Sequence, residues 1–285
     1  MKQNIKTFAL PFPNLLYFGI GAIILLGLNS CDIEPEQTVP DRQWELVWAD
    51  EFDGAEGASI DSNNWTYDIG QGVDGWGNQE FQTYTDRPEN VYLDGQGNLV
   101  IQAIRENFAG ASFSSGRIKT QGEFSQTYGR FEARIITPYG PGIWPAFWML
   151  GSNIDEVSWP QCGEIDIMEL KGNQPNILYG SVHGPGYSAG NAITSSLSLQ
   201  NDRFDNDYHV FAIEWGEDYI DFFMDDQWYQ SLSPEDLTGE WVFNQDFFLL
   251  LNVAVGGTFV GFPTADTPFP QQMIVDYVRV YEQIQ

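Results

Sequence analysis

Residues 128–137 read YGRFEARIIT, and the pattern of this stretch decides the class of fold. Apolar Phe131, Ala133 and Ile135 alternate with charged residues. Residues two apart lie on the same face of a β-strand, so the alternation separates an apolar face from a charged one. The stretch is therefore predicted to be a strand.

The same signal recurs along most of the chain. Further strands are predicted at residues 98–105, 208–215, 219–224, 247–255 and 273–281, which are rich in β-branched and aromatic residues. The 29 Gly and 15 Pro punctuate these segments, and no long window shows a clean helical period. Many strands without helices predict an all-β fold of two packed antiparallel sheets, a jelly-roll sandwich.

Length and charge narrow the class of partner. The 285 residues carry 40 Asp and Glu against 12 Lys and Arg, a formal net charge of −28. Such a field repels polyanions, which argues against nucleic acid, anionic membrane surfaces and heavily sulfated polysaccharides. With 42% hydrophobic and 15% aromatic residues the chain is not of the disordered class. One large β-sandwich domain is permitted at this length.

The N-terminus reads as a targeting segment. Residues 1–30 contain Lys2 and Lys6 and then an apolar run, the pattern of a secretory signal peptide. The run is shorter than the roughly 20 residues that a spanning helix needs, which disfavours the alternative of a transmembrane anchor. The end of the run resembles a bacterial lipobox, which implies lipidation of Cys31, export, and anchoring at the outer membrane or cell surface. Residues 31–42 are then an acidic, solvated tether, and residues 43–285 form the folded domain.

Residues 163–170, GEIDIMEL, hold three carboxylates on one predicted strand. Glu164 and Asp166 share a face, but Glu169 has the parity of the buried face. A buried, unpaired Glu is costly, whereas one extra residue in a β-bulge at Ile167 and Met168 returns Glu169 to the carboxylate face. A bulge is therefore predicted.

Three acids gathered in this way can do chemistry. The two Glu carboxyl groups can approach to about 5–5.5 Å, the spacing of a retaining glycosidase. Crowding raises at least one pKa, so that one group stays protonated as an acid while another attacks as a nucleophile. The alternative reading is an ordinary solvated acidic strand face, which is common in a chain with 40 acids.

Aromatic residues near the acids favour a sugar site. Trp144 and Trp148 share a strand face, and Trp159 lies close by in sequence. Flat aromatic faces suit the C–H-rich faces of sugar rings, although any single Trp is more often part of a core. Cys162 lacks the neighbours needed for metal or thiol chemistry and is predicted to be a packed free thiol.

Beyond these residues the chain resembles glycoside hydrolase family 16, and within it the bacterial laminarinases (endo-β-1,3-glucanases). The resemblance spans nearly all of residues 44–282. Its blocks are residues 48–53, 75–80, 87–91, 140–150, 159–170, 183–186, 252–257 and 275–281, in family order. Residues 257–261 depart from it, because they lack the Trp that often follows the double glycine.

The resemblance implies a jelly roll with a concave substrate cleft and assigns roles by position. Glu164 is the implied nucleophile, Glu169 the acid and base, and Asp166 the residue that orients and tunes the nucleophile. The implied glucan contacts are Asn78, Arg117, Trp144, Trp148, His183 and Asn252. No cofactor is needed for the chemistry. Many members bind a structural Ca²⁺, for which the matching positions are Glu51 and Gly97, through backbone oxygens, and Asp276.

The leading hypothesis is a monomeric endo-hydrolase that cuts internal β-1,3 bonds of a neutral glucan with retention of configuration. A second reading keeps the chemistry but takes mixed β-1,3/1,4-glucan as substrate. A third is a surface glycan-binding lipoprotein that has lost catalysis, which the presence of all three acids disfavours.

Overall fold

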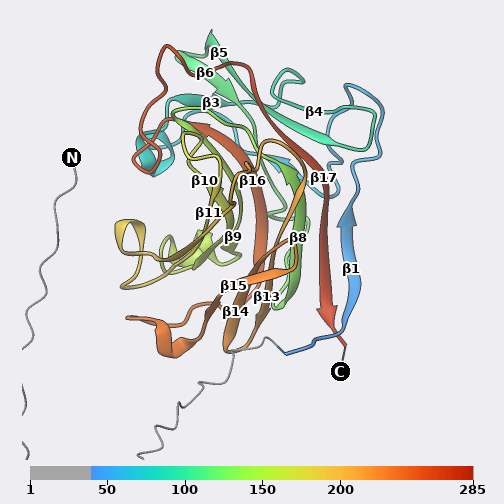
Figure 1. The fold of residues 1–285 in the computed structure, drawn as a ribbon, viewed down its shortest axis with the longest axis vertical. Helices are drawn as coiled ribbons and strands as arrows, with labels where there is room; N and C mark the ends of the chain where they lie inside the picture. The colour runs from blue at the N-terminus through green and yellow to red at the C-terminus, as the bar shows by residue number, and fades with distance from the viewer. Residues whose placement is uncertain (1–39, 285) are drawn as a thin grey trace, which may run out of the picture. The chain divides into compact units, whose positions relative to one another are not determined.

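The computed structural model describes residues 40–284, and these residues form two stacked β-sheets (Figure 1). Residues 1–30, Cys31 and most of the predicted tether lie outside this range. The larger sheet runs in the order β15 (Gln227–Leu232), β14 (Tyr219–Met224), β13 (His209–Gly216), β8 (Gly129–Ile136), β17 (Gln271–Gln283), β5 (Leu99–Phe108), β6 (Ala111–Ser115) and β3 (Gln82–Tyr84), with β1 (Trp44–Asp50) beside β17 and β4 (Val91–Leu93) beside β5.

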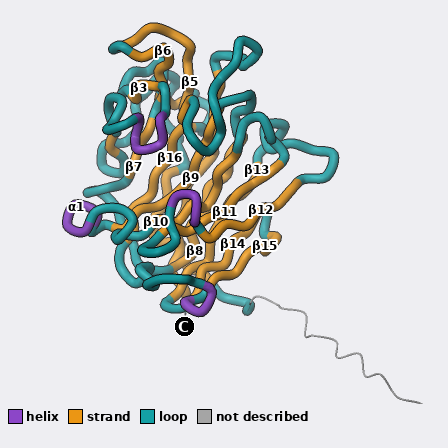
Figure 2. Tube along the Cα trace, turned by 90° about the vertical axis from the view of Figure 1, so that its left-hand side faces the viewer, coloured by secondary structure: helices purple, strands orange, loops and turns teal. Residues whose placement is uncertain are grey.

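The smaller sheet carries the candidate site. Its order is β12 (Ile193–Ser198), β11 (Ile177–His183), β10 (Glu164–Leu170), β9 (Ile143–Gly151), β16 (Phe247–Val255), β7 (Arg117–Lys119) and β2 (Thr66–Tyr67). Figure 2 turns this sheet toward the viewer. Helical structure among the described residues is confined to the short turns η1 (Gly75–Gln79), α1 (Ile154–Val157), η2 (Ala189–Asn191) and η3 (Pro234–Asp236), and none of these is long and apolar enough to cross a membrane.

The six strands predicted from alternation are all present, as β5, β8, β13, β14, β16 and β17. One detail of the prediction is wrong, because β3 pairs with β6 in parallel. Between these two strands the chain first passes through β4 and β5. No hairpin turn therefore forces β3 and β6 to be antiparallel.

The core lies between the two sheets. Phe131, Ala133 and Ile135 of β8 are fully buried, as the alternation predicts. In the smaller sheet, the central strand β16 is buried along its whole length. Trp215 is buried, and Cys162 is a buried free thiol whose pKa burial raises to about 11, which agrees with a packed rather than reactive residue.

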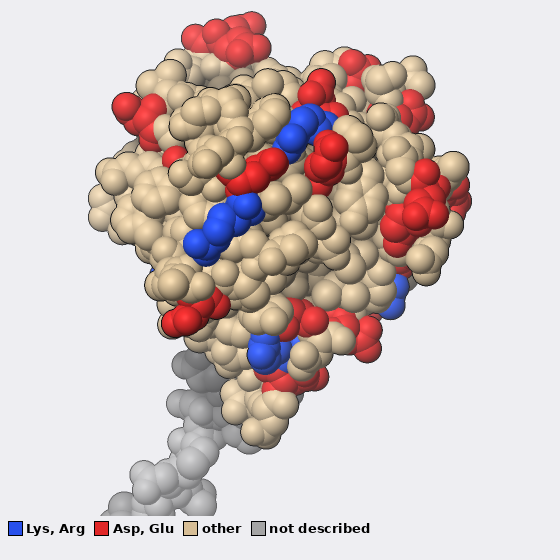
Figure 3. All heavy atoms as spheres, turned by 90° about the horizontal axis from the view of Figure 1, so that it is seen from above, with Lys and Arg blue, Asp and Glu red and all other residues tan. Residues whose placement is uncertain are grey.

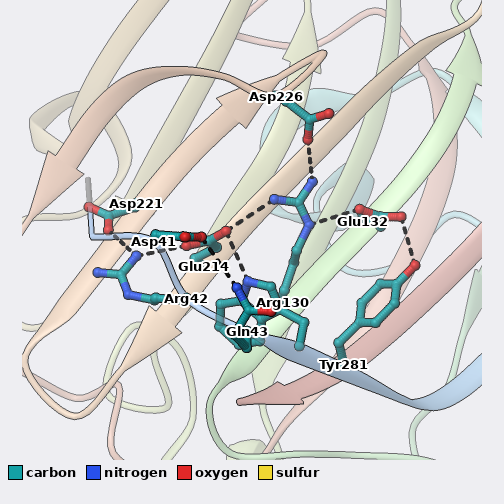
Figure 4. Close-up of polar contacts among 10 residues, drawn as sticks. Asp41, Arg42, Gln43, Arg130, Glu132, Glu214, Asp221, Asp226 and Tyr281 are labelled. Atoms are coloured by element: carbon teal, nitrogen blue, oxygen red, sulfur yellow. Dashed lines mark hydrogen bonds and ion pairs between the residues drawn. The ribbon is translucent and has the colours of Figure 1, made fainter. Parts of the chain in front are cut away.

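The outer face of the larger sheet bears a cluster of polar groups around Arg42, Arg130 and Glu214 (Figure 4). Arg42 Nη1 lies 2.7 Å from Glu214 Oε2 and 2.8 Å from Asp221 Oδ2, with only 9% of its side chain exposed. Arg130 joins Glu214 to Glu132, which accepts a hydrogen bond from Tyr281. Arg42, placed by the sequence in the solvated tether, is therefore part of the folded domain.

Candidate active site

The predicted bulge in β10 is present. Against β11, Glu164 pairs with His183, Asp166 with Ser181, and Glu169 with Tyr179. The partners on β11 are two residues apart each time, whereas the last step along β10 takes three residues. The register with β9 shifts at the same place, between Asp166 and Met168. The extra residue brings all three carboxylates to one face of the sheet, while Ile165, Ile167 and Met168 are buried in the core.

The three carboxyl groups are largely removed from water. Asp166 and Glu169 are buried and Glu164 is nearly so. Burial is the main reason that the pKa of each group rises to about 8, and the repulsion of Asp166 adds to the shift of both glutamates. Because the groups interact, they lose their protons one after another as the pH rises, so ionised and protonated carboxyls coexist over part of the pH range.

His183 approaches the carboxylates from β11. Its Nε2 lies 3.0 Å from Asp166 Oδ2 and 3.6 Å from Glu164 Oε1. The backbone N–H of Ala189 donates to Nδ1 at 3.1 Å, so the ring proton belongs on Nε2, the atom that faces the acids. Asp166 Oδ2 accepts no hydrogen bond from the described residues, and the closeness of His183 is an electrostatic contact.

Two tryptophans line the next strand, β9. Trp144 Nε1 donates to Glu169 Oε1 at 2.8 Å, which directly links one predicted glucan contact to a predicted catalytic acid. Trp148 Nε1 donates to Asn252 Oδ1 at 2.8 Å, and Trp148 lies opposite Asp166 in the sheet. The exposed Trp159 lies beyond them, with its ring centroid 6.0 Å from that of His183.

The other predicted glucan contacts lie on the far side of β9. Arg117 pairs with Asn252 in the register of β7 and β16. Its guanidinium lies over the rings of Trp76, at 4.6 Å, and Trp148, at 4.8 Å, and forms an ion pair with Asp68. Asn78 is part of turn η1, and its backbone oxygen accepts from Thr258 N–H.

Sequence reasoning missed several residues of this site. Glu80, Gln82 and Tyr84 form a hydrogen-bonded group beside Asn78 and Asn252. Glu80 closes one of the family-like blocks, but nothing in that block distinguishes it as a site residue. Phe259 stands in the segment that lacks the expected Trp, and its ring packs against Trp144 at 5.2 Å. That end of the site therefore keeps an aromatic wall.

The three positions predicted for calcium lie elsewhere, beside β17. Asp50, the end of β1, pairs with Val278, and Leu99, the start of β5, pairs with Val275. Glu51 directly follows Asp50, and Gly97 lies two residues before Leu99. On β17, Asp276 lies between Val275 and Val278. Arg279 holds the Glu51 carboxylate, which leaves the backbone oxygen as its donor. Two carbonyls and a carboxylate are donors suited to Ca²⁺, although Arg134 also contacts Asp276, at 2.6 Å.

The structure is a sandwich of two β-sheets, and one face of the smaller sheet carries three largely buried carboxyl groups with tryptophan side chains beside them. This fold and this site define a carbohydrate-active protein of the jelly-roll class. Residues 77–276 match the family described as Glycosyl hydrolases family 16, and the chain belongs to this family.

Individual relatives agree in sequence and fold. The beta-glucanase of Rhodothermus marinus is 41% identical over 274 residues, which cover 92% of this chain and 93% of that protein. The laminarinase catalytic domain of Thermotoga maritima is 46% identical with a TM-score of 0.81, covering 85% of this chain and 99% of that one. The endo-β-1,3-glucanase of Pyrococcus furiosus is 44% identical, also with a TM-score of 0.81, covering 86% and 96%. The predicted family and fold are confirmed.

Proposed function

We propose that the protein is an endo-acting glycoside hydrolase that cuts internal β-1,3 bonds of neutral β-glucans with retention of configuration. The observation that carries this proposal is the bulged strand β10, which turns Glu164, Asp166 and Glu169 to one face beside Trp144. The relatives named as laminarinase and endo-β-1,3-glucanase support the linkage. On the face drawn in Figure 3, the Lys and Arg side chains lie beside Asp and Glu and form no separate basic patch. An uncharged substrate suits such a surface better than a polyanion.

In the first step the Glu164 carboxylate attacks the anomeric carbon. The bond from that carbon to the bridging oxygen breaks, and Glu169 gives its proton to the leaving oxygen. The Trp144 N–H occupies Glu169 Oε1, so the proton is held at Oε2. The products of this step are a glycosyl ester on Glu164 and a released glucan fragment with a new non-reducing end; the new reducing end forms only when water cleaves the ester.

In the second step water attacks the same carbon. Glu169, now ionised, takes a proton from the water, and Glu164 leaves as a carboxylate. When Asp166 is ionised, its charge disfavours a second negative charge on either glutamate and so favours the protonated form of Glu169. His183 offsets this at Glu164, where its Nε2–H faces the carboxylate that must be ionised.

Digestion of a panel of neutral β-glucans tests the proposal. We expect laminarin to yield a ladder of β-1,3-linked oligosaccharides early in the reaction, with the newly formed anomer, followed by NMR, in the β configuration. Faster release of oligosaccharides from cereal glucan than from laminarin would show that mixed β-1,3/1,4-glucan is the preferred substrate. If no new reducing ends form from any member of the panel, the protein is a glycan-binding protein and the hydrolase proposal is wrong.

We also propose that Glu51, Gly97 and Asp276 bind a structural Ca²⁺. Their oxygen donors and their convergence beside β17 support this. After treatment with a chelator, adding Ca²⁺ should raise the melting temperature of the wild type but not of Asp276→Asn, while the exposed Asp266→Asn should behave as the wild type. An unchanged melting temperature of the wild type on adding Ca²⁺ would show that Asp276 serves only to pair with Arg134.

We propose, from the sequence of residues 1–42, that the protein is exported as a monomer and tethered by lipid on Cys31. Labelling of the full chain with a radioactive fatty acid in a bacterial host should be lost in Cys31→Ala and kept in Cys162→Ala. If the wild-type chain carries no label, or if Cys31→Ala keeps the label, the proposal of a lipid anchor on Cys31 is wrong. The sedimentation coefficient of the domain without its lipid anchor should be that of a monomer.

A further inference from the structure

We propose that Glu80 is a positioning residue of the glucan site, whose carboxylate ends a directed chain of hydrogen bonds that orients Trp148, Asn252 and Asn78. The inference rests on the proposed function, since it concerns contacts to the same glucan. The three side chains that it orients come from β9, β16 and η1, which are separate parts of the chain.

The first arm of the chain starts at Trp148. An indole N–H can only donate, so Asn252 must turn its Oδ1 toward Trp148, at 2.8 Å. The amide nitrogen of Asn252 then faces the Tyr84 hydroxyl and donates to it at 3.2 Å. Because the Tyr84 oxygen accepts here, its own proton is free to be donated to Glu80 Oε2, also at 3.2 Å.

Two more donors converge on Glu80. The backbone N–H of Val255 donates to Gln82 Oε1 at 2.7 Å, which fixes the orientation of that amide. Gln82 Nε2 therefore faces Glu80 Oε2, 2.6 Å away. On the other oxygen, Asn78 Nδ2 donates to Glu80 Oε1 at 3.2 Å, which leaves the Asn78 carbonyl free for a ligand.

All these bonds run in one direction, so the residue at their meeting point must accept from three donors and offer none. Only an ionised carboxylate does this. A glutamine at position 80 would place its amide N–H₂ group against one of these donors, so that hydrogen bond would be lost. The donor left without an acceptor could not easily bond to water instead. Gln82, Tyr84 and Asn252 are at most 6% exposed. The amide and indole orientations upstream would then no longer be fixed.

The experiment compares Glu80→Gln with the matched control Glu89→Gln, which makes the same change at an exposed residue. A β-1,3-linked glucose hexamer is the probe, with kcat and KM from product release and the dissociation constant from tryptophan fluorescence. For Glu80→Gln we expect KM and the dissociation constant to rise about tenfold, while kcat falls less than threefold. Glu89→Gln should match the wild type.

Tyr84→Phe supplies a second, independent variant, because it removes only the link between Glu80 and Asn252. It should raise KM by a smaller factor, and the double variant should be no worse than Glu80→Gln alone, since both changes break one chain. A lower melting temperature with KM within twofold of the wild type, in Glu80→Gln or in Tyr84→Phe, would make the network merely structural and overturn the inference. A wild type that binds the hexamer without cleaving it would refute hydrolysis, yet the dissociation constants would still decide the role of Glu80.

Discussion

At the scale of single residues, the site depends on carboxyl groups that the fold removes from water. Asp166 is 3% exposed, and burial raises its pKa from an ordinary value of 3.8 to about 8. Such a group binds more protons in the folded than in the unfolded protein between these two values. The free energy of unfolding therefore falls as the pH rises through that window.

Asp166→Asn removes one of the groups that cause this fall. We expect the melting temperature of the variant to decline less than that of the wild type between pH 4 and pH 8. Thermal unfolding followed by circular dichroism measures the slopes, with the exposed Asp86→Asn as control. Identical slopes for Asp166→Asn and the wild type would show that Asp166 is not held protonated by the fold.

The bond from Trp144 to Glu169 makes a second residue-scale prediction. Burial and then the charge of Asp166 raise the pKa of Glu169, and the Trp144 N–H partly offsets them. Trp144→Phe removes the offset, so this pKa should rise further. Glu169 would then stay protonated to higher pH, and the alkaline limb of the kcat/KM profile should move upward.

The same variant should lose about tenfold in kcat/KM, as expected for the loss of a hydrogen bond of about 1.5 kcal/mol. Trp241→Phe, whose indole donates to Asn244, should leave the alkaline limb in place. A limb that stays fixed or moves to lower pH in Trp144→Phe would contradict the assigned role of the bond.

At the scale of elements, the bulge of β10 could be predicted because parity and burial cost leave Glu169 few alternatives. The strands could be predicted for the same reason, since alternation records which face is buried. The Glu80 network could not, because η1 and β3 are too short to show a period and their partners are distant in sequence. The parallel pairing of β3 with β6 likewise follows from the path of the chain and not from the residues of either strand.

Gly163 sets the start of β10, and this leads to a prediction at the element scale. Its φ is +79°, and a Cβ there would lie 2.9 Å from Phe247 Cζ. Gly122 has a similar φ of +88° but open space around it. Both Ala variants incur backbone strain of about 1–2 kcal/mol, and crowding adds to the cost only at Gly163.

Gly163→Ala should therefore lower the free energy of unfolding by at least about 1 kcal/mol more than Gly122→Ala. Urea denaturation of the two variants and the wild type measures the difference. Equal losses would mean that the entry to β10 is not crowded.

At the scale of the whole domain, Arg42, near the start of the described residues 40–284, is tied to the outer face of the larger sheet. Arg42 is paired with Glu214 and Asp221, both buried (Figure 4). The sequence assigned this residue to the tether because it follows an acidic stretch, and no local pattern reveals partners more than 170 positions away.

Arg42→Met should lower the free energy of unfolding by about 2–3 kcal/mol, because it leaves buried carboxylates with fewer partners. Arg203→Met is the matched control, since Arg203 is 42% exposed in its pair with Asp205 and should change stability by less than about 1 kcal/mol. Denaturant titration distinguishes the two. Equal effects would place Arg42 outside the cooperative fold.

The proposed activity of the whole protein depends on a hydrolytic centre formed by the bulged strand β10. The most direct test is the release of reducing ends from laminarin by the wild type, Glu164→Gln, Glu169→Gln and the exposed control Glu89→Gln. We predict that the two site variants lose turnover by about 10³-fold or more while still binding the glucan, and that the control keeps wild-type activity. Full activity in either site variant would contradict the proposal that Glu164 and Glu169 carry out the hydrolysis.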